Sequence, residues 1–422
     1  MINIQSFTAN FNREPLISPF GFKGGFIDEL WHSRVKLTSS AGTSYTGRGT
    51  QSVLWSDPGV FSSYSATGGN ALMLLVSEYC AKLYTTRPCK DPMDMFDAVY
   101  PEIYEYAKKL TGVSALRPTF ALNAMVPCDN ALWLVYAQEN GIDGFDGLIP
   151  KSYQASFTAR HAKLAAIPLI TYGTTLAEVR GLADSGYAVF KIKIGSDSDK
   201  DGDLQKMLEW DMSRLKDIHS VLRDYKTPYT STGKLAYYLD ANGRYDTLDR
   251  VQKLLDFAKS IGAIEQIVLL EEPFPENSGI DVSSLPITVA ADESAHSDTD
   301  VNELIGLGYK AIALKPIAKT MSMSFKIASA ANKLGVPCFC ADLTVDPLLV
   351  DFNKCFAARL PSIPGMKIGV IESNGPQNYA DWPRMLSEHP VPDGEWIPVT
   401  NGVFDLSESF YRLSGGIFKQ AD

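Results

Sequence analysis

Five charged residues close five short apolar runs of this sequence. The runs VFKIK, LAYYLD, IVLLE, ITVAAD and AIALK end at Lys193, Asp240, Glu271, Asp292 and Lys315. Parallel strands that form a barrel present their carboxyl ends at one rim, so the pattern predicts lysines and carboxylates that face one another. Three converging carboxylates repel one another unless a cation or protons lie between them. Oxygen ligands with open positions are typical of Mg²⁺, so the three acids are candidate magnesium ligands.

Each of these acids taken alone is more often a strand-end cap or one half of a surface ion pair. The metal prediction therefore depends on the occurrence of all three in consecutive units of the chain. Glu272 and Glu293 directly follow two of the three acids. Adjacent strand residues point to opposite faces, so only one acid of each pair is expected to face a metal. The pattern does not say which one.

The lysines suggest proton transfer. Lys191 and Lys193 are two residues apart on one predicted strand, so both point into the barrel, and Lys315 ends a strand on the far side of the acids. A lysine beside a divalent cation and a second lysine is shifted toward its neutral form, which a general base needs. Two such bases can remove a proton from one face of a carbon and return one to the other. A structural ion pair, a phosphate contact or a Schiff-base lysine at Lys315 are the alternatives.

The elements that carry these residues alternate between apolar runs and helical stretches. Eight runs lie near residues 167, 189, 236, 267, 287, 311, 337 and 367, with helical segments such as 248–262 and 324–335 between most of them. Eight βα units predict an α/β fold of the TIM type, a (β/α) barrel with its active site at the carboxyl ends of the strands. An open doubly wound sheet is the alternative, but the first run is not followed by a GxGxxG motif.

The amino-terminal part has a different pattern. Residues 15–55 contain alternating runs that predict antiparallel strands, and 70–84, 94–110 and 128–141 have helical spacing. We therefore predict an α+β domain over residues 1–150, a barrel over 160–384 and a tail over 385–422 that returns to the first domain. A long insertion is expected at 196–235, where the βα rhythm is interrupted.

Composition limits the possible partners. The chain has 422 residues, 45% of them hydrophobic, and a net charge of −10, so it lacks the basic surface that nucleic acid requires. We expect no membrane contact and a cytoplasmic location, since no run reaches the roughly 18 apolar residues of a membrane span and no signal peptide is evident. The six cysteines lack a CxxC spacing and are expected to be reduced and buried. A soft-metal site at Cys338 and Cys340 is disfavoured because no further ligands accompany them.

The segments KIK, LDANG, LEEP, ADES and LKP, in this order, resemble the enolase superfamily and its muconate lactonizing enzyme subgroup. PFGFKGGFIDELWHSRVKL resembles the start of that family's capping domain, and PCDNALW resembles the capping helix that leads into the barrel. The resemblance covers nearly the whole chain. It implies a barrel capped by an α+β domain that the amino-terminal region and the tail form together. It also implies one Mg²⁺ per subunit, for which Mn²⁺ can substitute. A homo-oligomer is expected.

The resemblance assigns roles to residues. Lys193 and Lys315 match an opposed pair of acid and base groups, and Lys191 matches a neighbour that stabilises developing negative charge. The matched Mg²⁺ ligands are Asp240, Glu271 and Asp292, with Asn242, Glu272 and Glu293 placed around them. The implied reaction is abstraction of the α-proton of a small carboxylate through an enolate, which gives racemisation, epimerisation or cycloisomerisation. A syn-dehydratase similar to o-succinylbenzoate synthase and a catalytically silent metal-binding protein are the alternatives.

Substrate residues are expected on loops of the capping domain and at the ends of strands seven and eight. The candidates are Phe22, Lys23, the Gly- and Ser-rich loop 57–69, Asp342, Glu372 and Asn374. Dipeptide epimerases of the subgroup carry Asp-x-Asp at the end of strand eight, whereas this chain has Glu372-Ser373-Asn374, which argues against a dipeptide. The mandelate racemase subgroup carries a His base near strand seven, and PCFCADLTVDP has none. The histidines are therefore expected to be structural or solvent-facing.

Overall fold

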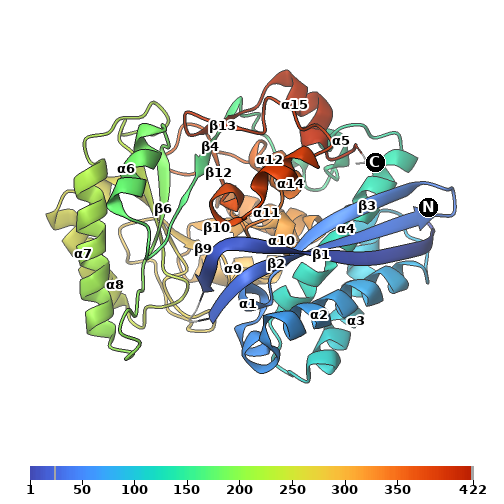
Figure 1. The fold of residues 1–422 in the computed structure, drawn as a ribbon, viewed down its shortest axis with the longest axis horizontal. Coiled ribbons are helices and arrows are strands. Elements are labelled where there is room, and N and C mark those ends of the chain that lie inside the picture. The colour runs from blue at the N-terminus through green and yellow to red at the C-terminus, as the bar shows by residue number, and fades with distance from the viewer. Residues whose placement is uncertain (23–24, 420–422) are drawn as a thin grey trace.

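The computed structural model describes residues 1–22 and 25–419 and shows two sheets with their helices (Figure 1). The amino-terminal sheet is antiparallel, with the order β1-β2-β3. Its elements and the helices that follow are β1 (Ile4–Phe22), β2 (Gly25–Ser39), β3 (Ser44–Gln51), α1 (Val53–Ser56), α2 (Pro58–Tyr84), α3 (Pro92–Thr111), α4 (Pro118–Glu139) and α5 (Phe145–Leu148). The predicted meander and the three predicted helices are confirmed.

The predicted loop over residues 57–69 is wrong, because α2 begins at Pro58. Asp57 caps this helix by accepting a hydrogen bond from the backbone N–H of Val60, and proline suits the first helical position. Only Ser65 within it has a non-helical conformation, with φ of 64°. Gly69 allows close packing, because a Cβ at this position would lie 2.4 Å from Val53. Composition alone suggested a loop where the structure has a packed helix.

The second sheet closes into a barrel. Its strands are β4 (Lys163–Ile167), β5 (Leu169–Ile170), β6 (Val189–Lys193), β7 (Ala236–Asp240), β8 (Ile267–Glu271), β9 (Val289–Ala291), β10 (Ala311–Leu314), β11 (Cys338–Cys340) and β12 (Gly369–Glu372). All of their pairings are parallel, from β5 through β6 and onward to β12 and β4. Strands β4 and β5 are one run that is interrupted at Pro168, which has no N–H to donate. Because β4 pairs with β12 and β5 pairs with β6, this run closes the sheet into a ring. The TIM-type barrel prediction is confirmed.

Helices follow the barrel strands. They are α6 (Leu176–Asp184), α7 (Leu204–Leu222), α8 (Leu248–Ser260), α9 (Asp298–Gly306), α10 (Pro316–Lys319), α11 (Met321–Lys333), α12 (Pro347–Ala357), α13 (Gly375–Asn378) and α14 (Trp382–Ser387). The predicted insertion at 196–235 contains α7 and a segment with two isolated antiparallel β-bridges of the backbone, one between Lys226 and Lys234 and one between Thr230 and Met366. The insertion therefore supplies one ordinary barrel helix and a short folded segment before β7.

The tail forms a hairpin of β13 (Val399–Thr400) and β14 (Val403–Asp405), followed by α15 (Glu408–Leu413). Strand β14 pairs antiparallel with β4, so the hairpin extends the barrel sheet. Contact with the amino-terminal region is made by the Tyr45 hydroxyl, which donates to the carbonyl of Phe418 at 3.3 Å. The predicted domain bounds stay predictions.

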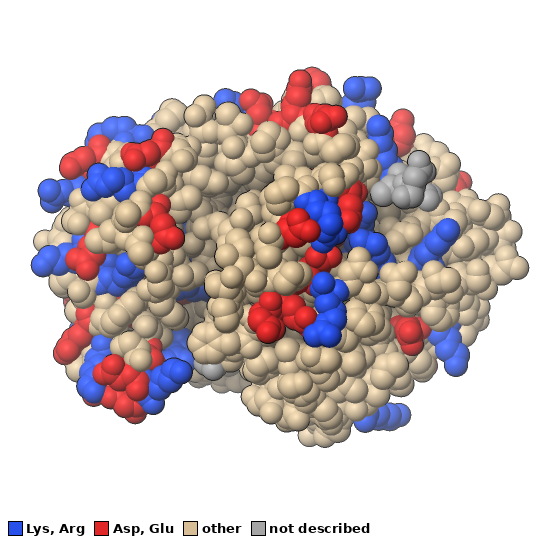
Figure 2. All heavy atoms as spheres, in the orientation of Figure 1, with Lys and Arg blue, Asp and Glu red and all other residues tan. Residues whose placement is uncertain are grey.

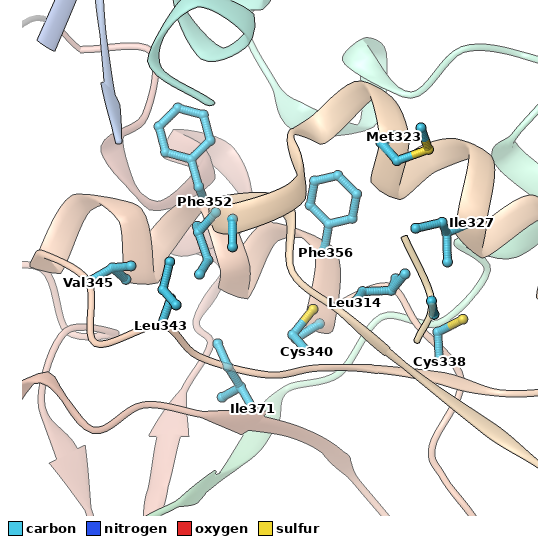
Figure 3. Close-up of a cluster of buried hydrophobic side chains, with 14 of the residues drawn as sticks. Leu314, Met323, Ile327, Cys338, Cys340, Leu343, Val345, Phe352, Phe356 and Ile371 are labelled. Carbon is cyan, nitrogen blue, oxygen red and sulfur yellow. The ribbon is translucent and has the colours of Figure 1, made fainter. Parts of the chain in front are cut away.

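A cluster of buried apolar side chains joins the strands β10, β11 and β12 to α11 and α12 (Figure 3). Cys338 and Cys340 lie in it beside Leu314 and Phe356. Burial raises the pKa of the Cys338 thiol to about 12, so this sulfur stays a neutral thiol among hydrocarbon neighbours. All six cysteines are buried and free. These cysteines fill the core, as expected.

The surface shown in Figure 2 carries lysine, arginine, aspartate and glutamate side chains that are intermixed, without a broad patch of one sign. None of the helices in the described part of the chain is long and apolar enough to span a membrane.

Candidate active site

A cavity lies between the amino-terminal sheet and the carboxyl ends of the barrel strands. Its roof is almost wholly apolar: besides Ser52, the amino-terminal region contributes Leu16, Phe20, Ile27, Leu30, Leu54 and Trp55. Its floor is charged and polar, with Lys191, Lys193, Asp240, Asn242, Glu271, Asp292, Glu293, Lys315, Asp342, Thr344, Glu372 and Asn374. The structure thus brings the predicted lysines and acids into one cavity.

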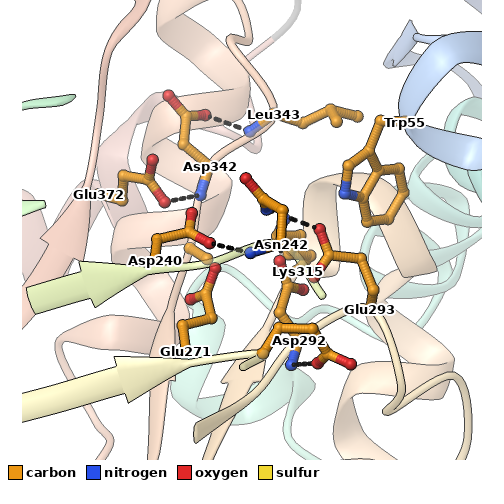
Figure 4. A network of polar contacts seen from close by, with 12 residues as sticks. Trp55, Asp240, Asn242, Glu271, Asp292, Glu293, Lys315, Asp342, Leu343 and Glu372 are labelled. Carbon is orange, nitrogen blue, oxygen red and sulfur yellow. Dashed lines mark hydrogen bonds and ion pairs between the residues drawn. The ribbon is translucent and has the colours of Figure 1, made fainter. Parts of the chain in front are cut away.

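Three carboxylates of the floor have the arrangement of a cation site. One oxygen from each of Glu271, Asp292 and Glu293 lies within 4.8 Å of the other two, and all three residues are buried (Figure 4). In each residue one carboxylate oxygen is buried without a hydrogen-bond partner: Oε2 of Glu271, Oδ1 of Asp292 and Oε2 of Glu293. The Oδ1 atom of Asp292 has only an ion pair of 3.5 Å with the Nζ of Lys319. Buried charges are costly unless a counter-charge is present. Three such oxygens therefore fit a hard divalent cation such as Mg²⁺.

Glu293 is closer to this cluster than the sequence predicted. Alternation along a strand was expected to turn it away from Asp292, but β9 ends at Ala291, so the rule does not apply beyond that residue. The Oε1 atom of Glu293 accepts a hydrogen bond of 3.0 Å from the amide of Asn242. The other oxygen, Oε2, is buried without a hydrogen-bond partner. Glu293 was expected only around the ligands.

Asp240 lies beside Glu271 in the register of β7 and β8. Its Oδ2 is 2.6 Å from the Nζ of Lys193 and 3.0 Å from the Nζ of Lys191, and its Oδ1 accepts from the backbone N–H of Asn242. Burial alone would raise the pKa of Asp240, but the two ammonium groups hold this pKa well below its usual range. Asp240 therefore stays ionised and is paired with both lysines.

Lys191 contacts three carboxylates. Its Nζ lies 3.0 Å from Asp240, 3.0 Å from Glu271 and 3.1 Å from Glu372. Burial acts to lower its pKa, yet the three acids raise this pKa well above the usual lysine range. Lys191 is thus a permanent positive charge at the centre of the floor, which suits the stabilisation of a developing anion and not the work of a base.

Lys315 follows β10 and pairs with Asp292, at 2.5 Å between Nζ and Oδ2. Burial lowers the pKa of Lys315, but Asp292 and Glu293 raise it further, so the net direction is upward. This direction is opposite to the one predicted for a lysine beside a bound cation. In sheet order, β6 with Lys193 and β10 with Lys315 flank the three strands that carry the acids. The two lysines therefore stand on opposite sides of the carboxylates.

Two further residues brace the acids. Lys319, which the sequence reasoning missed, is fully buried and donates to the backbone carbonyls of Asp292 at 2.6 Å and Ala295 at 2.9 Å. The signal for it was present, since Lys319 follows Lys315 by four residues in LKPIAK. Glu272, whose φ is 41°, accepts hydrogen bonds from the backbone N–H of Asp292 at 2.9 Å and from the backbone N–H of Ser294. It supports the loop without facing the cation cluster.

The rim at the ends of β11 and β12 holds three predicted substrate residues, Asp342, Glu372 and Asn374, whereas the predicted segment 57–69 supplies none of the described residues that line the cavity. The backbone N–H of Asp342 donates to Glu372 at 3.1 Å, and the backbone N–H of Asn374 donates to Asp342 at 2.8 Å. Burial and the nearby Glu372 raise the pKa of Asp342 to about 7. Asp342, which follows β11, is thus a second acid beside Glu372. The sequence Glu372-Ser373-Asn374 at the end of strand eight does not reveal this second acid, because Asp342 comes from the neighbouring strand. Lys23 and the side chain of Phe22 lie outside the described residues.

None of the five histidines is among the described residues that line the cavity. His32 contacts the hydroxyl of Tyr379 at 2.7 Å, and burial lowers the pKa of this histidine to about 4. The others make structural contacts: His161 with the Leu360 carbonyl, His219 with Tyr237, His296 with Glu276 and His389 with Asp351.

Comparison with known proteins decides the family. A family model for the carboxyl-terminal domain of mandelate racemase and muconate lactonizing enzyme, described as "Enolase C-terminal domain-like", matches residues 174–391, more than half of the chain. The chain belongs to the mandelate racemase/muconate lactonizing enzyme family of the enolase superfamily. Among curated proteins, no sequence matches it.

Solved structures of this enolase superfamily share the fold. A mandelate racemase/muconate lactonizing protein from Herpetosiphon aurantiacus is 18% identical, with a TM-score of 0.64 and 96% of each chain covered. A dipeptide epimerase from Cytophaga hutchinsonii, complexed with Mg and the dipeptide D-Ala-L-Val, is 15% identical, with a TM-score of 0.64, 90% of this chain and 89% of that chain covered. The L-Ala-D/L-Glu epimerase from Bacillus subtilis is 17% identical, with a TM-score of 0.62, 90% of this chain and 91% of that chain covered.

Proposed function

We propose that this protein is a Mg²⁺-dependent enzyme that abstracts the α-proton of a carboxylate substrate and forms an enolate. Racemisation, epimerisation or cycloisomerisation follows from how the proton is returned. The observation that carries the proposal is the set of three buried carboxylates, each with an oxygen that accepts no hydrogen bond, with a lysine on either side of them. A structural role would leave such oxygens hydrogen-bonded.

Glu271 and Asp292 would hold the cation, with Asp240 and Glu293 as the carboxylates on either side that complete the set. When bound, Mg²⁺ supplies positive charge that offsets the negative charge developing on the substrate carboxylate. Lys191 adds a fixed positive charge on the same floor, since it pairs with three acids. The cavity roof excludes water from the reacting carbon through its leucines, Phe20 and Ile27.

Lys193 and Lys315 are the proposed proton carriers. Lys193 Nζ is held by Asp240 at 2.6 Å, and Lys315 Nζ is held by Asp292 at 2.5 Å. Each lysine thus has a carboxylate that fixes its position. The same carboxylate balances the positive charge of the lysine when the lysine holds a proton. If both lysines transfer protons, the configuration of the α-carbon inverts. If only one does, a β-substituent leaves or a ring opens or closes.

The test is exchange of the α-hydrogen with deuterated solvent, followed by ¹H NMR across a carboxylate library that includes dipeptides and N-acyl amino acids. With Mg²⁺ present, the α-proton signal of at least one compound is expected to disappear. Loss of water with a new conjugated absorbance would identify the syn-dehydratase alternative. Mg²⁺ binding without exchange of any compound would contradict the proposal and favour a catalytically silent metal-binding protein.

A further inference from the structure

Asp211 is a buried carboxylate of α7 that joins this helix to two loops of the site. It is fully buried, and its Oδ2 accepts hydrogen bonds from the backbone N–H of Gly195 at 2.8 Å and from the hydroxyl of Tyr245 at 2.7 Å. Its Oδ1 accepts from the backbone N–H of Ser196 at 3.4 Å. These donors follow β6 and β7, two of the strands whose ends carry the charged residues of the site. A barrel helix therefore holds the loops after two neighbouring strands.

The first of these loops begins directly after Lys193, the last residue of β6. Gly195 and Ser196 come two and three residues after this lysine, in the irregular segment before α7. Gly195 has φ of 84°, and a Cβ there would lie 2.6 Å from the side chain of Arg244. The chain therefore turns immediately after Lys193 and packs against the next loop. The hydrogen bonds to Asp211 hold this turn.

The second loop follows Asp240, at the end of β7, and also contacts Lys193. Asn242 accepts a hydrogen bond from the Lys193 Nζ and donates its backbone N–H to Asp240. Tyr245 lies three residues further along the chain and is 1% exposed, and its hydroxyl donates to Asp211. Asp211 thus holds both ends of the Lys193 side chain, namely the backbone from which it leaves and the loop that contacts its Nζ.

Lys315 is held by a different set of contacts. Ser322, near the start of α11, donates its backbone N–H at 3.1 Å and its hydroxyl at 2.5 Å to Asp129 of α4. Asp129 is fully buried, like Asp211. The hydrogen-bond partners of Asp211 follow β6 and β7, and none of the described residues after β10 is among them. The surroundings of the two lysines can therefore be perturbed separately.

We propose that Asp211 is a positioning residue for Lys193, which holds the ammonium of this lysine toward one face of the substrate α-carbon. Asp211 is not among the described residues that line the cavity, so it acts through Gly195 and Tyr245. This assignment rests on the proposed function, in which Lys193 is a proton carrier. A displacement of about 1 Å at a catalytic group can cost about 10²-fold in rate, so loss of Asp211 should slow proton transfer at one face only.

The first experiment needs no substrate. The protein is treated with acetic anhydride, and mass spectrometry measures the acetylation rate of Lys193 relative to that of Lys315. Asp211→Ala should raise this ratio about fivefold, because a Lys193 side chain that is no longer held against Asp240 is more accessible to the reagent. Asp211→Asn keeps one accepting oxygen and should stay within about twofold of the wild-type ratio. An unchanged ratio in Asp211→Ala would overturn the proposal.

Asp129→Ala is the matched control. Burial raises the pKa of both carboxyls to about 6, so the two variants remove similar groups from similar surroundings. Because the partner of Asp129 follows Lys315, this variant should leave the ratio of Lys193 to Lys315 acetylation unchanged or lower it. An equal rise of the ratio in both variants would indicate a general loosening of the fold and would contradict the positioning role. Circular dichroism checks that the variants fold.

The second experiment measures exchange of the α-hydrogen with deuterated solvent for separate enantiomers of the carboxylate library, beginning with N-acetyl-L-leucine and N-acetyl-D-leucine. Lys193→Ala identifies the enantiomer whose hydrogen Lys193 removes. Asp211→Ala should slow exchange of that enantiomer about 10- to 100-fold and exchange of the other less than about threefold, and Asp211→Asn should restore most of the lost rate. Equal slowing of both enantiomers, or of neither, would overturn the proposal.

The two experiments distinguish this proposal from the proposed function. If the wild-type protein exchanges none of the compounds, the proposed function fails, and the acetylation ratio still decides whether Asp211 positions Lys193. If exchange occurs and Asp211→Ala matches the wild-type protein in both experiments, the proposed function stands and the positioning role is wrong. Should Asp211→Ala not fold, Tyr245→Phe removes one hydrogen bond to Asp211 without removing a charge. It should raise the acetylation ratio about threefold, and an unchanged ratio would contradict the proposal.

Discussion

Replacement of Glu271 by Gln tests whether the acid cluster is a cation site. The change keeps the shape of the side chain and removes one of the three charges whose oxygens lie within 4.8 Å of one another. The Oε2 atom of Glu271 has no other partner, so its charge has no role in the cation-free protein beyond the pairing of Oε1 with Lys191 at 3.0 Å. Removing one partner of a buried charge pair costs about 3–5 kcal/mol. Mg²⁺ binding should therefore weaken about 10²- to 10⁴-fold.

Calorimetric titration with Mg²⁺ measures this change, and Glu272→Gln is the matched control. Glu271 ends β8 and Glu272 follows it, and both are fully buried, but the Oε2 atom of Glu272 accepts from the backbone N–H groups of Asp292 and Ser294. A glutamine retains one accepting oxygen there, so its effect should stay near tenfold, typical of a residue that supports a ligand. Wild-type affinity in Glu271→Gln, or an equal loss in both variants, would refute the cation site.

Two predictions concern stability. The buried Asp211 carboxyl, which accepts from Gly195 and Tyr245, has a pKa raised by burial from 3.8 to about 6. The folded state therefore binds the proton more tightly than the unfolded state. The stability of the wild-type protein relative to Asp211→Asn should rise by about 2 kcal/mol as the pH falls from 7 to 4, measured by urea titration. A constant difference across that range would contradict this. Lys319→Met removes the donor to the backbone carbonyls of Asp292 and Ala295, so the free energy of unfolding should fall by about 2–4 kcal/mol in the same assay. The control is Lys253→Met on the exposed face of α8, which should lower the free energy of unfolding by less than about 0.5 kcal/mol.

The strand ends of the barrel were predictable because an apolar run followed by a charge is a local signal. Val189–Lys193 and Ile267–Glu271 have the predicted bounds. The start of the first barrel strand was placed too late, since Pro168 divides the run and the pairing with β12 begins at Leu164. The strand predicted over 287–292 is shorter in the structure and covers Val289–Ala291.

The chemistry of the site was predictable by residue type and less so by geometry. Alternation could not place Glu293, because its backbone has left the strand. The pairing of Asp342 with Glu372 joins two strands that are adjacent in space and 30 residues apart in sequence. The hydrogen bonds of Asp211 had no sequence signal, since they join α7 to two loops of the site. These features depend on contacts between residues that are distant in sequence, so they can be recognised only in the structure.

The most direct test of the central claim is solvent exchange with single lysine variants. For a compound that exchanges its α-hydrogen with deuterium in the wild-type protein with Mg²⁺, Lys193→Ala and Lys315→Ala should each abolish exchange from one face or both, while Lys253→Ala should exchange at the wild-type rate. Retained wild-type exchange in both lysine variants would contradict the account.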